Sequence, residues 1–460
     1  MISATHRIGT AQFVVAIAAV VLAGVLLSTG PDAVLARVAA ISALSVALFA
    51  TRLLPEVVTA LGTFLGFIAL AVAPTEVIFS GFASSGFWLL FAGLIIGTAM
   101  TATGLGMQLA LRIFQRTGTF YVRASVLLAL CGLGFGLLVP STLPRVIVLM
   151  PIALSLAQTM GYSPGSRGHV GLCVMAATAT LLPTYAFLTA NLPTIIQFGA
   201  TETLYGIAPS YAQYFIEQAP LNILRFVALL GIMLITAPGQ ARTLPNVTAP
   251  DLFDSAQRRL LGLLAVAIGF WMTDALHGIS PAWVALVLAA ILLIPAFGML
   301  DAGAMKSKVD LSPAFFLAAL FAISAVAQFT GLGSVVADRL IPVMGLGSGG
   351  DLWNLYAVSG LSMVLSHLTT APAAPAVLVP LAAAFATETG WSIKTVAMVQ
   401  VIGLSTPILP YQAPPLIVAM ALAAIPVSAL IRVCAALAVV VAVVGIPVTY
   451  VWWSWLGIFG

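Results

Sequence analysis

The stretch VPSTLPRVIVLMP, residues 139–151, places an arginine between prolines in the middle of a long apolar segment. The surrounding segment, 124–158, exceeds the roughly 20 residues of one straight membrane helix, and Pro140 and Pro144 interrupt it near its centre. Such a segment is typical of a re-entrant helical hairpin whose tip lies at membrane depth. There, Arg145 costs on the order of 2.5–3.5 kcal/mol, so its presence needs an explanation.

A second segment, 352–386, has the same design, with Pro372 and Pro375 near its centre. The rest of the 460-residue chain fits a membrane protein, because 62% of its residues are hydrophobic and 7% are charged. Apolar windows predict spans near 11–28, 34–50, 56–73, 86–102, 168–190, 221–237, 259–274, 282–298, 312–328, 394–421 and 428–452. The window at 11–28 is too long for the apolar core of a signal peptide, so we expect a retained span.

Basic residues give the orientation. If the N-terminus is cytoplasmic, the outer segments hold only Arg339 and Lys394 among the loop cations. The inner segments then hold Arg7, Arg52, Arg112, Arg116, Arg123, Arg167, Arg242, Arg258, Arg259, Lys306 and Lys308. This positive-inside bias predicts a cytoplasmic N-terminus, with the first hairpin on the cytoplasmic side and the second on the outer side.

The chain also contains an internal repeat. TGLG occurs at residues 103–106 and again at 330–333, an offset of 227 residues, and three proline landmarks recur at offsets of 226 to 229. Because the loop after the first TGLG is basic and the loop after the second is not, the two copies fit opposite orientations. The sequence therefore predicts an all-α polytopic membrane protein, with about eleven transmembrane helices plus two re-entrant hairpins in two inverted-topology repeats.

This division gives four parts. Residues 1–53 form N-terminal spans of a scaffold, and residues 54–237 form the first repeat. Residues 238–258 form a cytoplasmic linker, and residues 259–460 form the second repeat. Paired broken helices leave backbone groups unbonded at membrane depth, where they can bind ions only if they line a cavity, so the pattern indicates a transporter.

The motifs LPEVVTALG, GFASSGFWLLFAGLIIGTAMTATGLG, VLMPIALSLA, TANLPTII and LPYQAPPLIVAMA occur in that order between residues 54 and 421. In order and spacing they resemble the divalent anion/sodium symporters, which carry dicarboxylates, citrate or sulfate. The resemblance implies a homodimer in which a hairpin-containing domain slides past a scaffold as an elevator. It also implies a small anionic substrate and sodium or protons as coupling ions, with no other cofactor or metal.

In that family each hairpin tip carries a Ser-Asn-Thr motif that holds substrate and sodium. Both tips of this chain lack the asparagine. The resemblance places substrate binding at Ser141, Thr142, Asn191, Thr369, Thr370, Gln412 and Pro414, and the charge buried at membrane depth adds Arg145 to this set. It places a coupling ion at Ser141, Thr180, Thr184, His367, Ser405 and Thr406, which lie at the tips or in two stretches expected to be unwound.

Two roles for Arg145 stay open. Its guanidinium can bind a substrate carboxylate or oxyanion, or it can pair with carbonyl groups freed at the kink. In the first case it replaces part of the charge of a coupled sodium ion, which favours proton coupling, exchange or uniport. His367, the only histidine expected deep in the fold, is a candidate for protonation or a structural residue. Tyr185 and Tyr411 can bind an oxyanion or satisfy local backbone groups.

Other cations are expected at the membrane interface. Arg37, Arg225 and Arg432 fall near predicted span ends, where long side chains reach the lipid headgroups, so we assign them no chemistry.

The alternatives to a carboxylate carrier are a permease for sulfate, phosphate or arsenite, a cation/proton antiporter and, more distantly, a membrane-embedded lipid enzyme. The enzyme would need paired carboxylates or a metal cluster, and the sequence shows neither. Nucleic-acid binding is not expected, and a bacterial chain of this kind would lie in the inner membrane.

Overall fold

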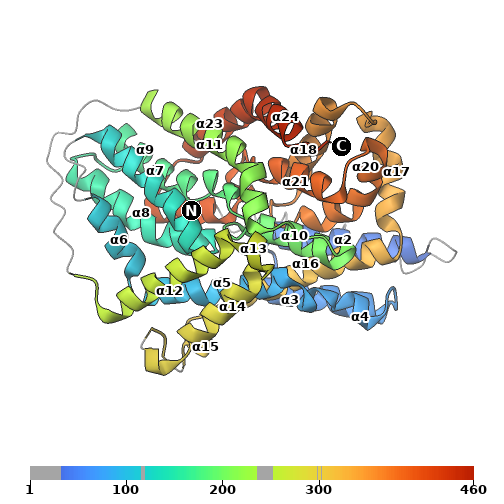
Figure 1. The fold of residues 1–460 in the computed structure, drawn as a ribbon, viewed down its shortest axis with the longest axis horizontal. Helices are drawn as coiled ribbons and strands as arrows, with labels where there is room; N and C mark the ends of the chain where they lie inside the picture. The colour runs from blue at the N-terminus through green and yellow to red at the C-terminus, as the bar shows by residue number, and fades with distance from the viewer. Residues whose placement is uncertain (1–32, 115–119, 236–251, 298, 302, 460) are drawn as a thin grey trace, which may run out of the picture.

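The computed structural model describes residues 33–114, 120–235, 252–297, 299–301 and 303–459 (Figure 1). The predicted span 11–28 and most of the linker lie outside these residues. Every regular element in the described ranges is helical, so the prediction of an all-α polytopic fold is confirmed. Eight of the described helices are long and apolar enough to cross a membrane, and a bent pair would make a ninth.

The first half of the chain holds α2 to α11. The helices are α2 (Ala33–Thr51), α3 (Glu56–Ala69), α4 (Thr75–Ile78), η1 (Ser80–Ala83), α5 (Ser85–Ala102), α6 (Leu105–Phe114), α7 (Tyr121–Leu138), α8 (Thr142–Thr159), α9 (Arg167–Ala179), η2 (Pro183–Ala186), α10 (Leu192–Tyr205) and α11 (Tyr211–Ile235). The predicted hairpin 124–158 is the pair α7 and α8. No predicted span covered α10, which falls between the predicted spans 168–190 and 221–237.

The second half begins at α12. Its helices are α12 (Ser255–Met272), α13 (Asp274–His277), α14 (Pro281–Leu292), η3 (Pro295–Phe297), α15 (Ala304–Ser307), α16 (Ser312–Phe329), α17 (Leu332–Met344), α18 (Asp351–Leu368), α19 (Pro375–Leu378), η4 (Val379–Leu381), α20 (Ala382–Thr389), α21 (Ile393–Leu404), η5 (Pro410–Gln412), α22 (Pro414–Ala423), α23 (Val427–Val440), η6 (Val441–Gly445) and α24 (Ile446–Trp455). The predicted hairpin 352–386 is α18 with α19, η4 and α20.

The two halves interlock. Helix α14 packs against α5, and α16 packs against α3, so each half contributes to the other's core. Likewise α10 contacts α16 and α21, whereas α22 contacts α8. The α5–α10 contact is very close, because a Cβ atom added to Gly86 would lie 2.8 Å from the Cα of Gly199. The α7–α8 pair lies at the left end of Figure 1, whereas α17 and α20 lie at the right end.

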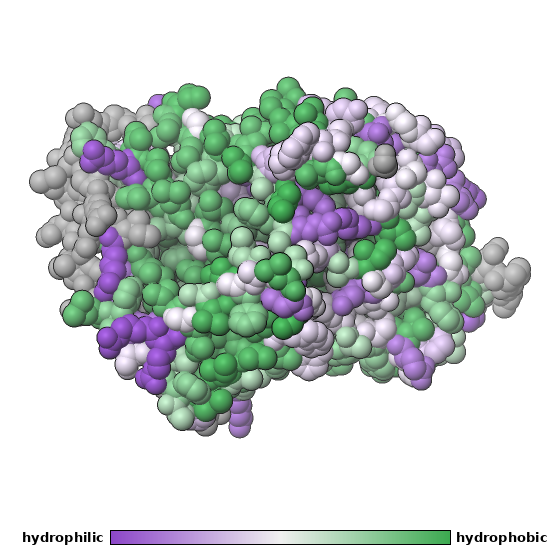
Figure 2. Space-filling view, in the orientation of Figure 1, coloured by the Kyte–Doolittle hydropathy of each residue, from purple (hydrophilic) through white to green (hydrophobic). Residues whose placement is uncertain are grey.

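The surface fits a lipid environment. Figure 2 shows broad apolar areas over the left and centre of one face, with strongly hydrophilic groups gathered at the lower left, near the centre and along the right side. Many large apolar side chains are exposed, among them Leu65, Ile223 and Val443. A water-soluble protein would not expose so many of them, whereas lipid solvates them at no cost. The chain is a multi-pass integral membrane protein.

Candidate functional site

The first candidate site lies at the break between α7 and α8. Helix α7 ends at Leu138 and α8 begins at Thr142, and the residues between them form an extended tip. Pro140 disfavours a helical conformation in the residue before it, which explains where α7 ends. Of the two prolines expected to interrupt this segment, Pro140 lies in the break, whereas Pro144 does not interrupt α8. Pro144 lies in the first turn of α8, where proline is tolerated because no intrahelical donor is needed.

An unwound stretch faces this tip. Helix α9 ends at Ala179 and α10 begins at Leu192, with the short η2 between them. The hydroxyl of Thr184 donates to the carbonyl oxygen of Leu181 at 2.8 Å, and it accepts from Nδ2 of Asn191 at 3.1 Å. These bonds satisfy backbone and side-chain groups inside the stretch, as burial in a membrane requires.

Arg145 joins the tip to the unwound stretch. Its side chain is 1% exposed. Nε donates to the Ser141 carbonyl oxygen at 3.0 Å. Nη2 donates to the Thr142 hydroxyl at 2.8 Å, to Oδ1 of Asn191 at 3.3 Å and to the Ala190 carbonyl oxygen. All these partners are neutral oxygen atoms, and no acidic side chain pairs with Arg145 within the described residues.

One nitrogen of Arg145 remains without a partner. Nη1 is buried and has no hydrogen bond within the part of the chain that the structure describes. Gly136 on α7 provides room for it, because a Cβ atom there would lie 3.1 Å from Nη1 and 2.6 Å from Cγ2 of Thr184. A buried guanidinium with an unused donor is suited to a carboxylate or another oxyanion. Both roles proposed for Arg145 are therefore compatible with its contacts.

The second hairpin also breaks near its centre. Helix α18 ends at Leu368, and α19 begins at Pro375. The Thr369 hydroxyl donates back to the Leu365 carbonyl oxygen at 2.7 Å. Thr370 lies in the break, where its carbonyl oxygen accepts from the amides of two following alanines. Neither threonine contacts the first site, so the structure describes two separate tips.

Gln412 attaches the second tip to the second unwound stretch. Its Oε1 accepts from the amides of Ile408 and Leu409 at 2.8 and 2.7 Å. Its Nε2 lies 3.1 Å from Nδ1 of His367 and 3.4 Å from the Ser366 hydroxyl. Pro414 begins α22 two residues further on. The amide of Gln412 is thus fully occupied by protein groups.

The expected place of the histidines needs a correction. His367 is only half-buried, and its Nδ1 lies 2.7 Å from the Met363 carbonyl oxygen. The hydroxyl of Tyr411 donates to the carbonyl oxygen of His367. His169, at the start of α9, is more deeply buried at 7% exposed, so His367 is not the only histidine deep in the fold. The sequence signal for His169 was weak because it lies close to a helix end.

Arg225 contradicts its predicted role as an interface anchor. Helix α11 begins at Tyr211, so Arg225 lies near the helix centre and is 2% exposed. Its Nη2 donates to the Thr406 hydroxyl at 2.9 Å and to the Ile402 carbonyl oxygen at 3.3 Å. Nη1 donates to Oδ1 of Asn222 at 3.0 Å. Arg225 therefore binds the start of the second unwound stretch, as Arg145 binds the end of the first.

A signal for Arg225 was present in the sequence. Tyr211, Tyr214, Gln218, Asn222 and Arg225 recur every three or four residues, and all five are buried on one face of α11. A polar stripe with this period in an apolar helix indicates an inward-facing polar surface. The predicted span began ten residues too late, at 221, which hid the stripe.

The two unwound stretches meet next to Arg225. A cavity of about 10 Å³, roughly the size of one water molecule, is lined by Leu182 of the first stretch and by Ser405 and Thr406 of the second. The Tyr214 hydroxyl donates to the carbonyl oxygen of Tyr185 at 2.8 Å. The buried Tyr185 side chain lies near both arginines.

The predicted site residues thus fall into three groups. The first joins Ser141, Thr142, Arg145, Thr180, Thr184 and Asn191; the second joins His367, Thr369, Thr370, Gln412 and Pro414; the third joins Ser405 and Thr406 to Arg225. Thr180 and Ser405 donate to carbonyl oxygens of the helices they follow, α9 and α21. Within the described residues no group of three or more His, Cys, Asp or Glu side chains could hold a metal ion.

Paired hairpins and broken helices around buried charge are typical of a membrane transporter. The chain matches the family described as the sodium:sulfate symporter transmembrane region over residues 10–459, and it belongs to that family. This confirms the family that the sequence resembles. The family consists of transporters rather than enzymes.

Individual relatives agree with this assignment. A membrane protein of Cupriavidus necator is 25% identical over 349 residues, which cover 73% of this chain and 68% of that protein. The L-tartrate/succinate antiporter of Escherichia coli K12 is 25% identical over 280 residues. That match covers 57% of this chain and 57% of the antiporter.

The fold has also been seen in a crystal structure. The Alcanivorax borkumensis YdaH transporter, reported to have an unusual topology, matches with a TM-score of 0.52 at 16% identity. The match covers 86% of this chain and 90% of YdaH. At this identity the likeness concerns the fold alone.

Proposed function

We propose that this protein is a secondary transporter that exchanges small dicarboxylate anions across the membrane. Arg145 and Arg225 supply fixed positive charge at the two unwound stretches. The family and the antiporters similar to this chain support an anion carrier of the dicarboxylate type.

The oxygen partners of Arg145 carry the proposal. Two backbone carbonyl groups, a threonine hydroxyl and an asparagine Oδ1 surround its guanidinium. Neutral oxygens from a hairpin tip and an unwound stretch are the ligands that a coupled sodium ion would use. In this chain the guanidinium already fills the place of a monovalent cation, so substrate binding there needs no sodium ion.

Fixed charge favours exchange over one-way transport. A sodium ion leaves the carrier together with the substrate, so the empty carrier can return without the positive charge of the ion. An arginine cannot leave, and moving it across the bilayer without an anion carries a penalty of several kcal/mol. A bound dianion would neutralise Arg145 and Arg225, so the loaded carrier would cross more easily than the empty one.

The proposed motion is that of an elevator. The two hairpins and the broken helices α9–α10 and α21–α22 would move as one block, because the contacts of Arg145 and Gln412 tie each tip to an unwound stretch. The scaffold would include α2, α3 and α14 and would form a homodimer. The proposal also includes two inverted repeats, the four parts predicted from the sequence, a cytoplasmic N-terminus and an inner-membrane location.

Within the site, Nη1 of Arg145 would bind one carboxylate of the substrate. Ser141, Thr142 and Asn191 would line the same end, while Thr369 and Thr370 at the second tip would approach the other carboxylate. Gln412 and Pro414 would shape that second end. Because the side-chain amide of Gln412 already contacts protein groups, its role would be to hold the tip rather than to recognise the anion.

Transport in proteoliposomes tests the proposal. Vesicles loaded with succinate, or left empty, are given labelled succinate with sodium or with N-methylglucamine outside. We expect uptake only into succinate-loaded vesicles and at equal rates with and without sodium. Sodium-driven accumulation in empty vesicles would show a symporter instead and would overturn the proposal.

Proton coupling is the second candidate, because His367 lies at the second tip and contacts Gln412. It predicts that uptake driven by a pH gradient depends on His367. If the dependence of uptake on pH is the same in His367→Asn as in the wild type, His367 takes no part in coupling. The hydroxyl groups of the other residues proposed for a coupling ion would then only stabilise the unwound stretches. These residues are Thr180, Thr184, Ser405 and Thr406.

A further inference from the structure

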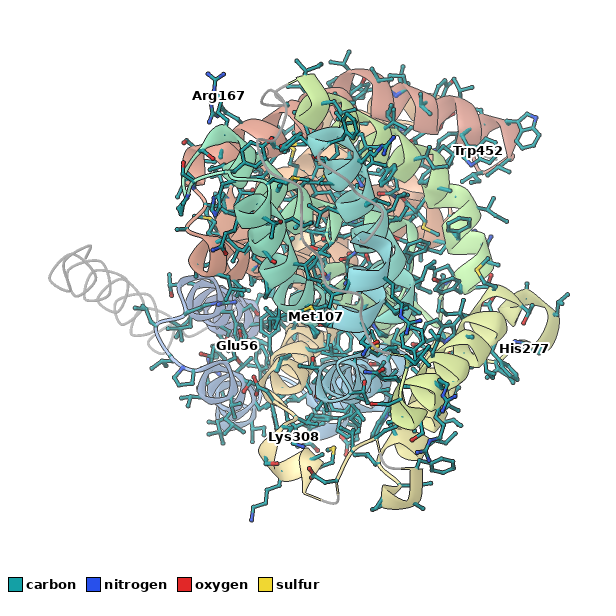
Figure 3. The ribbon with its side chains drawn as sticks, turned by 90° about the vertical axis from the view of Figure 1, so that its left-hand side faces the viewer. Glu56, Met107, Arg167, His277, Lys308 and Trp452 are labelled. Atoms are coloured by element: carbon teal, nitrogen blue, oxygen red, sulfur yellow. The ribbon has the colours of Figure 1, made fainter. Side chains whose placement is uncertain are left out.

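A second cavity lies apart from the three groups of site residues. It measures about 500 Å³, within the range of small-molecule sites. The start of α11, the start of α21, the residues after α24 and Ala275 of α13 line it. Its polar lining residues are Ser210, Gln213, Glu217, Ser392, Lys394 and Thr395. In Figure 3, α11 lies between the labelled Trp452 of α24 and His277 of α13.

Glu217 is the unusual member of this lining. Its side chain is 5% exposed, although it is a carboxylate in an apolar helix. Oε1 accepts from Nζ of Lys394 at 3.0 Å. Oε2 is buried and has no hydrogen-bond partner among the described residues. A buried carboxylate oxygen left unbonded costs free energy, and because Glu217 lines the cavity, a rotation of its carboxylate would bring Oε2 to a donor bound there.

The neighbouring charge limits what that donor can be. Nζ of Lys394 lies next to Oε1, so a second cation at Oε2 would be repelled. A neutral hydroxyl group can donate to Oε2 without this repulsion. Lys394 itself has three donors and gives one to Glu217, so it can bind a carboxylate with the others.

We propose that this cavity binds a hydroxylated carboxylate. The hydroxyl group of the ligand donates to Oε2 of Glu217, and its carboxylate accepts from Nζ of Lys394. The inference rests on the proposed function for the chemical class of the substrate, and it adds a site that distinguishes hydroxy acids from plain dicarboxylates.

The cavity is distinct from the central site. Helix α21 runs from Ile393 to Leu404, about 17 Å at 1.5 Å per residue. Lys394 lies at its first turn, whereas Arg225 binds its last turn and Thr406 lies just beyond it. The predicted topology places this end of α21 on the outer side of the membrane. A ligand arriving from outside would therefore meet Glu217 and Lys394 before it reached the arginines.

Calorimetric titration of the purified full chain with malate and with succinate tests the proposal. The two acids differ by one hydroxyl group. In wild type we expect malate to bind at two sites and succinate at one. In Arg145→Gln the central site is weakened, and malate should still bind at the cavity, at least about tenfold more tightly than succinate, as a hydrogen bond to a charged group allows.

Two further variants keep the test decisive if Arg145→Gln does not fold. Lys394→Met and Glu217→Gln should each abolish the extra malate site while succinate binding stays unchanged. Lys308→Met, which removes a different ion pair (Lys308 to Asp301, 2.6 Å), serves as the matched control and should keep both malate sites. Equal binding of malate and succinate in wild type, or two malate sites in Lys394→Met, would overturn the cavity proposal.

The outcome also separates this proposal from the proposed function. If the hydroxyl-selective site persists in Arg145→Gln while succinate exchange in that variant is unaffected, the cavity stands and the central role of Arg145 fails. If exchange is lost in Arg145→Gln but Lys394→Met keeps the preference for malate, the central role of Arg145 stands and the cavity proposal fails.

Discussion

The two unwound stretches are stabilised in different ways. At the first, a cation from the facing hairpin, Arg145, binds the stretch directly. At the second, the facing hairpin contributes His367 and the cation comes from α11, as Arg225. The first tip is thus linked to its stretch by charge, and the second by the neutral amide of Gln412. Charge at a moving tip has to be neutralised before the tip can leave its place, so the first tip is the one we expect to respond to the substrate anion.

Removing the charge at the first tip should have the largest effect. In Arg145→Gln the shorter amide cannot reach all the oxygens that the guanidinium binds, and the substrate loses its fixed cation. We expect uptake of succinate to fall about 10- to 100-fold, the loss typical of a charge-assisted hydrogen bond. Flux measurement in proteoliposomes provides the test.

Arg145→Lys is the matched control. It keeps the charge but cannot form the forked contacts, so its uptake should fall between those of the wild type and Arg145→Gln. Equal uptake in Arg145→Gln and wild type would remove Arg145 from substrate binding and leave it only the structural role.

Arg225→Gln should reduce uptake less than Arg145→Gln. Arg225 binds Thr406 of the second stretch and Ile402 of α21 from a neighbouring helix, and both of its terminal nitrogens already have protein partners. We expect a severalfold loss, accompanied by a lower melting temperature, because Asn222 and Thr406 lose a buried partner. Uptake and thermal unfolding are measured on the same preparation.

A loss in Arg225→Gln as large as that in Arg145→Gln would contradict the proposed difference between the stretches. Arg432→Gln offers a comparison at an exposed arginine whose Nε donates within its own helix, and it should change neither property.

The sequence predicted much of this arrangement. Prolines near the centres of the two long apolar segments located both tips, because proline acts locally through its own backbone, whereas the family resemblance located the two unwound stretches. Arg225 was misplaced for the opposite reason. Its role depends on α21 lying beside α11, a tertiary contact that a span boundary drawn from hydropathy does not contain. The pairing of Arg145 with Ala190 likewise depends on contact between distant segments.

Gln412→Ala should loosen the second tip without removing charge. The truncation leaves the amides of Ile408 and Leu409 without their buried acceptor, at about 1–3 kcal/mol for each group. We expect a lower melting temperature and faster hydrogen exchange at residues 405–413, while the affinity for succinate changes less than in Arg145→Gln.

Gln412→Glu is the comparison variant. It retains the acceptor oxygens but loses the Nε2 donor that lies beside His367 and Ser366, so the unwound stretch should stay protected while the tip is released. If both variants protect residues 405–413 as well as wild type does, Gln412 does not hold this stretch.

The smallest effect is expected from packing beside Arg145. A Cβ atom at Gly136 would lie 2.6 Å from Cγ2 of Thr184 and 3.1 Å from Nη1 of Arg145. Gly136→Ala therefore has to displace the threonine that bonds Asn191, at a cost of about 1–3 kcal/mol for overpacking. Gly134→Ala, two residues earlier on the same helix, meets nothing within 4 Å and should be neutral or slightly stabilising. Thermal unfolding with and without succinate separates the two variants. If the first tip responds to the anion, succinate should stabilise Gly134→Ala as it does wild type and Gly136→Ala by less, whereas equal stabilisation would mean that this close packing does not shape the anion site.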